Sequence, residues 1–424
     1  MARGPCGGRT GPARYRARVP EQTPFGEGPP PAEHRTAAQQ TRVWAVETLE
    51  EFDRVALGGS FTGCRVRSVD LTERTFALLV TDTSGAVFLG CPMEEQALAH
   101  VRAGGALVFP PVPDLPFDPY RAAPYTPDEL YAGLDEGGYE ATPDARTYAW
   151  MRGTTARGDV FASMLRSIHD DAVSDALDER LRGERVVGVM GGHAMERGGP
   201  AYAGAARMGR DLARQGLTVA TGGGPGAMEA ANFGAYAAAY DDVMLGKALD
   251  VLAGVPSYGP SVGAWASAAF AVRERWPDGG PSYGLPTWFY GHEPPNAFAA
   301  HLAKFFANAT REDGLLARCT AGVVFLPGAA GTVQEIFDAA TANYYGSRGE
   351  PAPMVLVDRA HWTAELPAWP LLEALAAGRT MARRIALVDS VTEVPAALAR
   401  LGADTGADTA PDTAADTVTD TAAG

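Results

Sequence analysis

The chain has 424 residues, of which 46% are hydrophobic, and its 51 acidic against 36 basic residues give a net charge of −15. This length can hold two or three domains, and the negative charge argues against nucleic acid as the main partner. No run of about 18 apolar residues predicts a membrane span, and the four cysteines show no paired spacing, so we expect a cytoplasmic protein.

The first part of the chain predicts a poorly structured start and a small module. Residues 1–40 are rich in Arg, Gly and Pro without periodicity, which is typical of a disordered segment. Residues 42–150 predict a small β-rich module followed by a Pro-rich connector, and we expect the connector at 111–150 to be irregular. Short apolar stretches mark the expected strands of the module, at 61–69, 75–80 and 85–89.

Residues 155–402 predict an α/β domain with a doubly wound, Rossmann-like parallel sheet. Near-continuous apolar runs alternate here with helical patterns, as in sheets that are covered on both faces. A helix at 201–215 joins the first two strands into a right-handed βαβ unit. The tail at 403–424 repeats Ala-Asp-Thr units and is predicted to be disordered and acidic. The expected strands of the domain are 185–190, 217–221, 322–326, 353–358 and 385–389.

Three turns that are poor in side chains follow strands of this domain. Ligands bind beyond the carboxyl ends of parallel strands where the strand order switches, so the turns predict one binding edge. The third turn opens into a helix at 332–340, and the free N–H groups at such a helix start suit a phosphate. The first two turns lack the G-x-G-x-x-G spacing, and no Walker A lysine is present. The residues predicted to bind a phosphate or nucleotide are Gly191, Gly192, Gly222, Gly223, Gly224, Gly226, Gly328, Ala330, Gly331 and Thr332.

Charged side chains near these turns are candidates for chemistry. Glu335 lies one turn into the third helix, where it is either a reactive carboxylate or a residue that only favours the helix dipole. Glu229, in the first turn of its own helix, is either a contact to the ligand or a residue that only favours the helix dipole. Arg311 is either a partner for a phosphate or a base edge, or part of a surface ion pair. His292, in an aromatic loop at 288–296, is a possible substrate contact like Glu229, and because the histidines form no cluster we expect no metal.

Two motifs, in this order, resemble the LONELY GUY (LOG) family. The first is TGGGPGAMEAAN at 221–232, and the second is PGAAGTVQE at 327–335. The resemblance covers residues 155–402 and implies a modified Rossmann-type fold and a homodimer or higher homo-oligomer. It also implies hydrolysis of nucleoside 5′-monophosphates to free base and ribose 5-phosphate, without a cofactor.

Position by position, the resemblance implies that Glu335 is the catalytic carboxylate and Arg311 the catalytic arginine. This sequence departs from the family pattern in two places. Ala329 replaces the second glycine of the motif, which is compatible with phosphate binding if its backbone φ is negative. The family's Met-His-x-Arg-Lys form around the arginine is absent, so Arg318 is a rival assignment. The implied phosphate cradle is Gly328, Gly331 and Thr332.

Three other functions are alternatives to hydrolysis: a pyridoxal enzyme, a non-catalytic binding protein, and a structural scaffold whose melting temperature a nucleotide would not raise. Older labels describe the family as lysine decarboxylase-like, but a pyridoxal enzyme needs a Schiff-base lysine. Lys247 and Lys304 both lie in helix-like stretches with no cofactor-binding context. The second alternative is a non-catalytic nucleotide sensor or cofactor carrier of the same fold, which the two departures from the family pattern favour.

Overall fold

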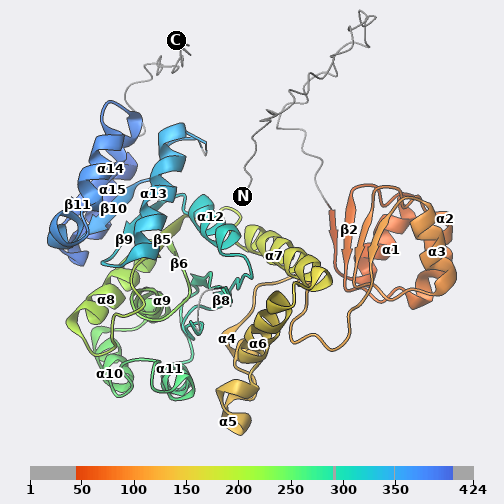
Figure 1. Cartoon of the computed structure of the whole chain (residues 1–424), viewed down its shortest axis with the longest axis horizontal. Helices are drawn as coiled ribbons and strands as arrows, with labels where there is room; N and C mark the ends of the chain where they lie inside the picture. Colours follow the sequence, from red (N-terminus) through yellow and green to blue (C-terminus); the bar gives the residue numbers. More distant parts are fainter. Residues whose placement is uncertain (1–43, 290–292, 348, 404–424) are drawn as a thin grey trace, which may run out of the picture. The chain divides into compact units, whose positions relative to one another are not determined.

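A computed structural model describes residues 44–289, 293–347 and 349–403. The segments predicted to be disordered, 1–40 and the tail beyond Ala403, lie outside the described residues. Within the described ranges the strands form two parallel sheets, one of four strands and one of seven (Figure 1). Across the same ranges, no helix combines the length and the apolar character that crossing a membrane requires.

The four-stranded sheet belongs to the N-terminal module and has the order β1-β2-β3-β4. Helices alternate with its strands, and Phe52, Phe61 and Phe88 pack in its core. The strands predicted within 61–69 and 85–89 are confirmed. The elements are β1 (Trp44–Val46), α1 (Leu49–Leu57), β2 (Cys64–Arg67), α2 (Thr75–Val80), β3 (Val87–Leu89), α3 (Glu95–Ala103) and β4 (Leu107–Phe109).

The strand predicted at 75–80 is wrong, because this stretch forms α2. A short apolar run fits either a buried strand or a helix, and periodicity alone does not separate the two. In the helix only Leu78 is buried, whereas Phe76 and Val80 face outward.

The expectation of irregular structure at 111–150 is also wrong in part. The segment contains α4 (Pro127–Leu130), α5 (Leu134–Gly137) and the start of α6 (Pro143–Ala156). Tyr125 exchanges two backbone hydrogen bonds with Leu302, of 2.8 and 2.7 Å, and so extends the edge of the larger sheet. This segment therefore packs as part of the α/β domain.

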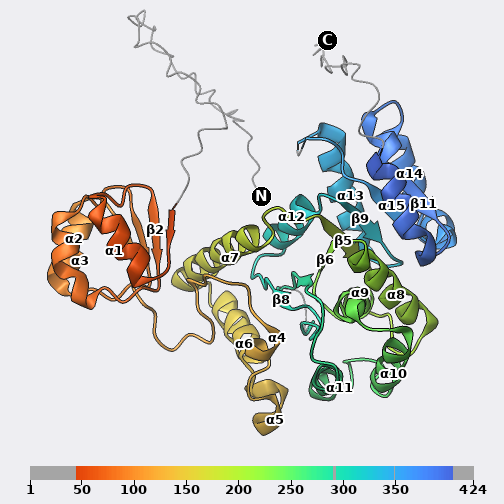
Figure 2. The same ribbon diagram turned by 180° about the vertical axis from the view of Figure 1, so that it is seen from behind.

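The seven-stranded sheet has the order β11-β10-β9-β5-β6-β7-β8, and all its strands are parallel (Figure 1 and, from behind, Figure 2). The five predicted strands are confirmed within one or two residues. The two-residue strands β7 and β8 were not predicted, because they are too short to show a pattern. The strands are β5 (Val186–Met190), β6 (Thr218–Thr221), β7 (Tyr283–Gly284), β8 (His301–Leu302), β9 (Gly322–Phe325), β10 (Met354–Val357) and β11 (Ile385–Val388).

Helices cover both faces of this sheet, which confirms the doubly wound, Rossmann-like architecture. One core joins alternate strand residues to α8 (Pro200–Arg214), α9 (Ala227–Tyr236), α10 (Asp242–Ala253), α11 (Val262–Arg275) and α15 (Val394–Ala403). The other core joins the remaining strand residues to α7 (Val160–Arg180), α12 (Asn308–Arg318), α13 (Ala330–Tyr345) and α14 (Ala368–Ala376).

The order of the strands reverses beside β5. The chain runs outward from β5 through β6, β7 and β8, and then returns to place β9 on the other side of β5. Open α/β sheets bind ligands in the crevice beyond the strand ends at such a point. The three glycine turns follow β9, β5 and β6, which are neighbours at this reversal.

Candidate functional site

The three glycine turns lie in contact with one another. The Gly192 N–H donates to the Pro327 carbonyl of the third turn at 3.1 Å, and its own carbonyl accepts from Ala227 N–H at 3.1 Å. The first turn is thus held between the other two. The predicted gathering of these turns at one edge of the sheet agrees with these contacts.

Glycine is required where the turns touch. Gly226 has a φ of +73°, and a Cβ there would lie 2.5 Å from the Gly192 carbonyl oxygen. Neither the left-handed conformation nor the space admits a side chain. The glycine pattern therefore allows the close approach of the first and second turns, in addition to any role in ligand binding.

A buried amide network fixes the second turn. The Asn296 N–H donates to the Gly223 carbonyl at 2.8 Å, and its side-chain amide donates to the Gly224 carbonyl at 3.2 Å. The same amide donates to Asn232 at 3.0 Å, and Asn232 also accepts from the Thr221 hydroxyl at 2.7 Å. Asn296 was not predicted as a site residue, although it ends the aromatic loop at 288–296 in which His292 is a possible substrate contact.

The third turn leaves the start of α13 open. Its N-cap residue, Ala329, provides no side-chain cap, and Ala329, Ala330 and Gly331 are exposed. Uncapped N–H groups at a helix start carry partial positive charge and suit an anion. The φ of Ala329 is −115°, so the methyl group that replaces the family glycine causes no backbone strain.

Glu335 and Arg311 form a buried pair next to this helix start. Arg311 Nη1 donates to Glu335 Oε1 at 3.0 Å, and the two side chains are each 12% exposed. Burial raises the pKa of the Glu335 carboxyl to about 7, although the adjacent guanidinium of Arg311 acts in the opposite direction. A carboxyl group with this pKa can exchange a proton near neutral pH.

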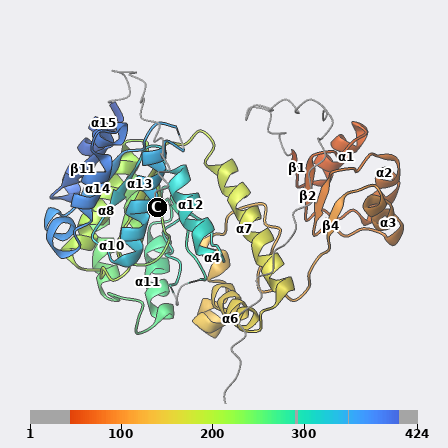
Figure 3. The ribbon, with the colours of Figure 1, turned by 45° about the horizontal axis from the view of Figure 1, so that its top comes forward.

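Arg311 also links this pair to the second turn. Its Nη2 donates to Asn308 Oδ1 at 2.9 Å, and a Cβ placed on Gly222 would lie 3.6 Å from its Nη1. The buried Nε has no hydrogen-bond partner among the described residues. Glu335, Arg311 and the glycine turns therefore form one cluster, and α12 and α13 lie side by side (Figure 3).

Arg318, the rival assignment, lies elsewhere. Its Nε donates to Asp178 at 2.8 Å, and its Nη2 donates to the Ser174 hydroxyl at 2.9 Å, both on α7. Its Nη1 donates to the Gly314 carbonyl at 2.7 Å. These contacts tie α12 to α7, so Arg318 is engaged away from Glu335.

His361 is a residue of this edge that sequence analysis missed. It opens a helical turn after β10, and its Nε2 lies 3.0 Å from the Gly328 carbonyl oxygen. Its Nδ1 lies 3.0 Å from Glu365 Oε2, and its ring packs edge-on against the buried Trp362. No local sequence motif marks His361. It lies close to Gly328 because β9 and β10, the strands that precede the two residues, are paired in the sheet.

Of the two predicted substrate contacts, the structure describes Glu229 but not His292. Glu229 is fully buried, and Arg197 Nε donates to its Oε2 at 2.9 Å. Arg197 also donates to the Trp265 carbonyl at 3.0 Å and stacks on its ring, so this pair braces the start of α9. His292 lies outside the described residues. Both contacts stay predictions.

The two lysines are not placed like a Schiff-base residue. Lys247 is exposed on α10. The helical environment predicted for Lys304 is wrong, because Lys304 follows β8 in an extended segment. Its Nζ is buried and donates to Asp144 Oδ1 at 2.6 Å, and burial lowers the pKa of this amine. Its environment is that of a structural ion pair.

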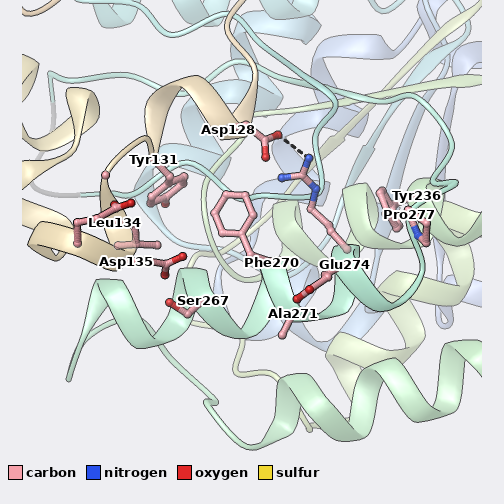
Figure 4. A pocket seen from close by; sticks show the side chains of 13 residues that line it. Asp128, Tyr131, Leu134, Asp135, Tyr236, Ser267, Phe270, Ala271, Glu274 and Pro277 are labelled. Atoms are coloured by element: carbon pink, nitrogen blue, oxygen red, sulfur yellow. Dashed lines mark hydrogen bonds and ion pairs between the residues drawn. The ribbon is translucent and has the colours of Figure 1, made fainter.

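A separate cavity of about 640 Å³ lies between α11 and the segment around α4 and α5 (Figure 4). Arg273 pairs with Asp128 at 2.7 Å on its wall, and Phe270 packs edge-on against Tyr131. None of the residues predicted to bind a nucleotide lines this cavity. It is distinct from the cluster at the strand ends.

Comparison with known proteins gives a family match for part of the chain. Residues 263–399 match the family model described as possible lysine decarboxylase. This match includes the second motif and Glu335, and it confirms the LONELY GUY-type resemblance over that segment. No curated protein matches the chain.

Two solved structures illustrate what the chain is similar to. One is the molybdenum cofactor binding protein from Rippkaea orientalis, with 16% identity over 50% of this chain and 94% of that chain, at a TM-score of 0.32. The other is the molybdenum cofactor carrier protein from Chlamydomonas reinhardtii, with 17% identity over 52% of this chain and 99% of that chain, at a TM-score of 0.33.

Proposed function

We propose, from the premise of a LONELY GUY-type domain, that this protein hydrolyses the N-glycosidic bond of nucleoside 5′-monophosphates. The products are the free base and ribose 5-phosphate. The observation that carries the proposal is the buried pair of Glu335 and Arg311 beside the uncapped start of α13. An anion site and a carboxylate one helical turn away suit the two ends of a ribose 5-phosphate unit.

The chemistry follows from the charge that develops during cleavage. Breaking the ribosyl–base bond builds positive charge on the sugar, which a nearby carboxylate stabilises. In this proposal Glu335 also takes a proton from the water whose oxygen bonds to C1′ as the C1′–base bond breaks, and this proton then passes to the departing base. The 5′-phosphate, held at the start of α13, supplies binding energy that positions the sugar. Arg311 orients Glu335 and neutralises the phosphate or contacts the leaving base.

The test is base release from AMP, GMP and CMP by wild type and by Glu335→Gln, followed by chromatography. We expect the substitution to lower the rate by about 10²-fold or more, because it removes the proton acceptor and its charge. Glu373→Gln is a matched control, since Glu373 is an exposed glutamate on α14. Unchanged base release from the Glu335 variant would refute the assignment.

The same premise extends to the assembly and location of the protein. We propose a homodimer or a higher homo-oligomer that works in the cytoplasm. Sedimentation of the purified full-length chain measures the assembly, and a monomer at micromolar concentration would contradict it.

The alternative function is nucleotide binding without turnover, as in a sensor or a cofactor carrier. One observation favours it: the guanidinium of Arg311 already has Glu335, Asn308 and Glu312 as partners within the chain. A nucleotide that raises the melting temperature without any release of base supports this alternative. Free base that accumulates in proportion to enzyme concentration supports the hydrolase.

A further inference from the structure

A second group of ionisable side chains lies beside the glycine turns and has no part in the mechanism above. His193 ends the first turn, and its Nδ1 lies 2.9 Å from Glu293 Oε1 in the loop at 293–299. Glu293 therefore lies against the Nδ1 side of the ring and orients it through this ion pair. Nε2 is then the ring nitrogen left to bind a ligand.

His193 borders a cavity of about 280 Å³. His193 and Tyr258 lie on its walls together with Gly226, and Trp265 and Glu229 form its buried side. The pKa of Tyr258 is raised, first by burial and then by the negative charge of Glu293. The volume is below the usual range for a complete small-molecule ligand but holds one planar ring system.

The cavity is close to the proposed phosphate site. Gly192, which directly precedes His193, bonds to Pro327 at the entrance of the third turn. A Cβ on Gly226 would lie 2.5 Å from the Gly192 carbonyl oxygen on the cavity side. The first turn therefore lies between the start of α13 and the cavity. The turn carries no side chain at Gly191 or Gly192, where a Cβ would lie 2.8 Å from the Ala227 Cβ and 3.3 Å from the Pro327 carbonyl oxygen, so only a thin layer of backbone separates the two places.

We propose that this cavity takes the nucleobase of the bound nucleotide, with His193 contacting the base and Glu293 acting as its positioning residue. The inference rests on the proposed nucleotide site and adds the residues that bind the base. The His193 ring nitrogen pairs with a polar edge of the base, and the ring of Tyr258 offers an aromatic surface against its face. The phosphate and sugar alone make neither contact.

The test compares a ligand that has a base with one that lacks it. Calorimetry measures the binding of AMP and of ribose 5-phosphate to the full-length chain in a Glu335→Gln background, so that AMP is not consumed. We expect His193→Ala to weaken AMP binding about tenfold, the value of one hydrogen bond to a buried ligand edge, and to change ribose 5-phosphate binding less than twofold. Glu293→Gln should produce a smaller loss in the same direction.

His100→Ala is the matched control, because His100 is an exposed histidine on α3 in the N-terminal module. Equal losses for AMP and ribose 5-phosphate in His193→Ala, or no loss for AMP, would overturn the inference. The inference would also be overturned if the Glu335→Gln chain bound AMP no more tightly than ribose 5-phosphate, or bound neither. If the wild type releases no base, but His193→Ala selectively weakens AMP binding, the hydrolase proposal is refuted and the base pocket stands.

Discussion

Arg311 and Glu335 are 24 residues apart in the chain and meet with 3.0 Å between Nη1 and Oε1. The contact exists because α12 and α13 flank β9 on the same face of the sheet. Burial and the charge of Arg311 act in opposite directions on the pKa of the Glu335 carboxyl. Burial dominates, so the guanidinium does not return the pKa of Glu335 to its ordinary value.

This balance predicts the pH dependence of activity. The carboxyl group has an ordinary pKa of 4.5 and a pKa of about 7 in the folded chain, so it holds its proton between these values. Because the reacting form is the ionised carboxylate, the rate should rise about tenfold per pH unit below 7 and level off above it. Initial rates of base release from pH 5 to 9 measure this, and a profile that is already flat at pH 5.5 would contradict it.

The two arginines of α12 should respond differently to the same substitution. Arg311→Lys replaces the planar fork that spans Glu335 and Asn308, and we expect base release to fall by about 10-fold to 100-fold. Arg318→Lys changes the contacts with α7 and with the Gly314 carbonyl of its own helix, so it should lower the melting temperature without lowering the rate of the folded enzyme. If both variants lose activity to the same degree, Arg311 has no special role.

Gly331→Ala tests the open start of α13. A Cβ at this position has nothing within 4 Å, and alanine favours a helix over glycine, so the folded chain should be at least as stable. The methyl group would occupy the space where a phosphate meets the N–H groups. Because one charge-assisted contact is then lost, nucleotide binding should weaken by about fivefold or more. Ala329→Gly, at a φ of −115°, should change binding less than about twofold. Equal affinity of both variants and wild type would place the phosphate elsewhere.

The Asp144–Lys304 pair tests how far the α/β domain extends. Asp144 also accepts from Trp288 Nε1 at 2.8 Å, so Asp144→Ala should cost about 3–5 kcal/mol by leaving a buried ammonium unpaired. Adding Lys304→Met should recover most of that stability, because no charge then remains buried. Denaturant unfolding measures both. A chain that begins at residue 155 should be destabilised like the single variant, and equal stability of all forms would show that the segment before 155 is not needed.

Much of the fold follows from patterns that neighbouring residues carry. The five long strands of the domain, the helices after them and the three glycine turns are visible in the sequence because burial on both faces requires continuous apolar runs. The same patterns fail for β7 and β8, which have two residues each, and for 75–80, where one apolar run fits two structures. The module boundaries at 42–150 and 155–402 stay predictions.

The sequence by itself determined that a phosphate-type turn with Glu335 one helical turn behind it stands at the edge of a doubly wound sheet. Turn chemistry and helical spacing are local, so they are legible in the order of the residues. Only the tertiary structure decided that Arg311 and not Arg318 meets Glu335, that Asp144 neutralises Lys304, and that His361 reaches Gly328. These pairings depend on which strands and helices become neighbours, and no spacing along the chain encodes that distance.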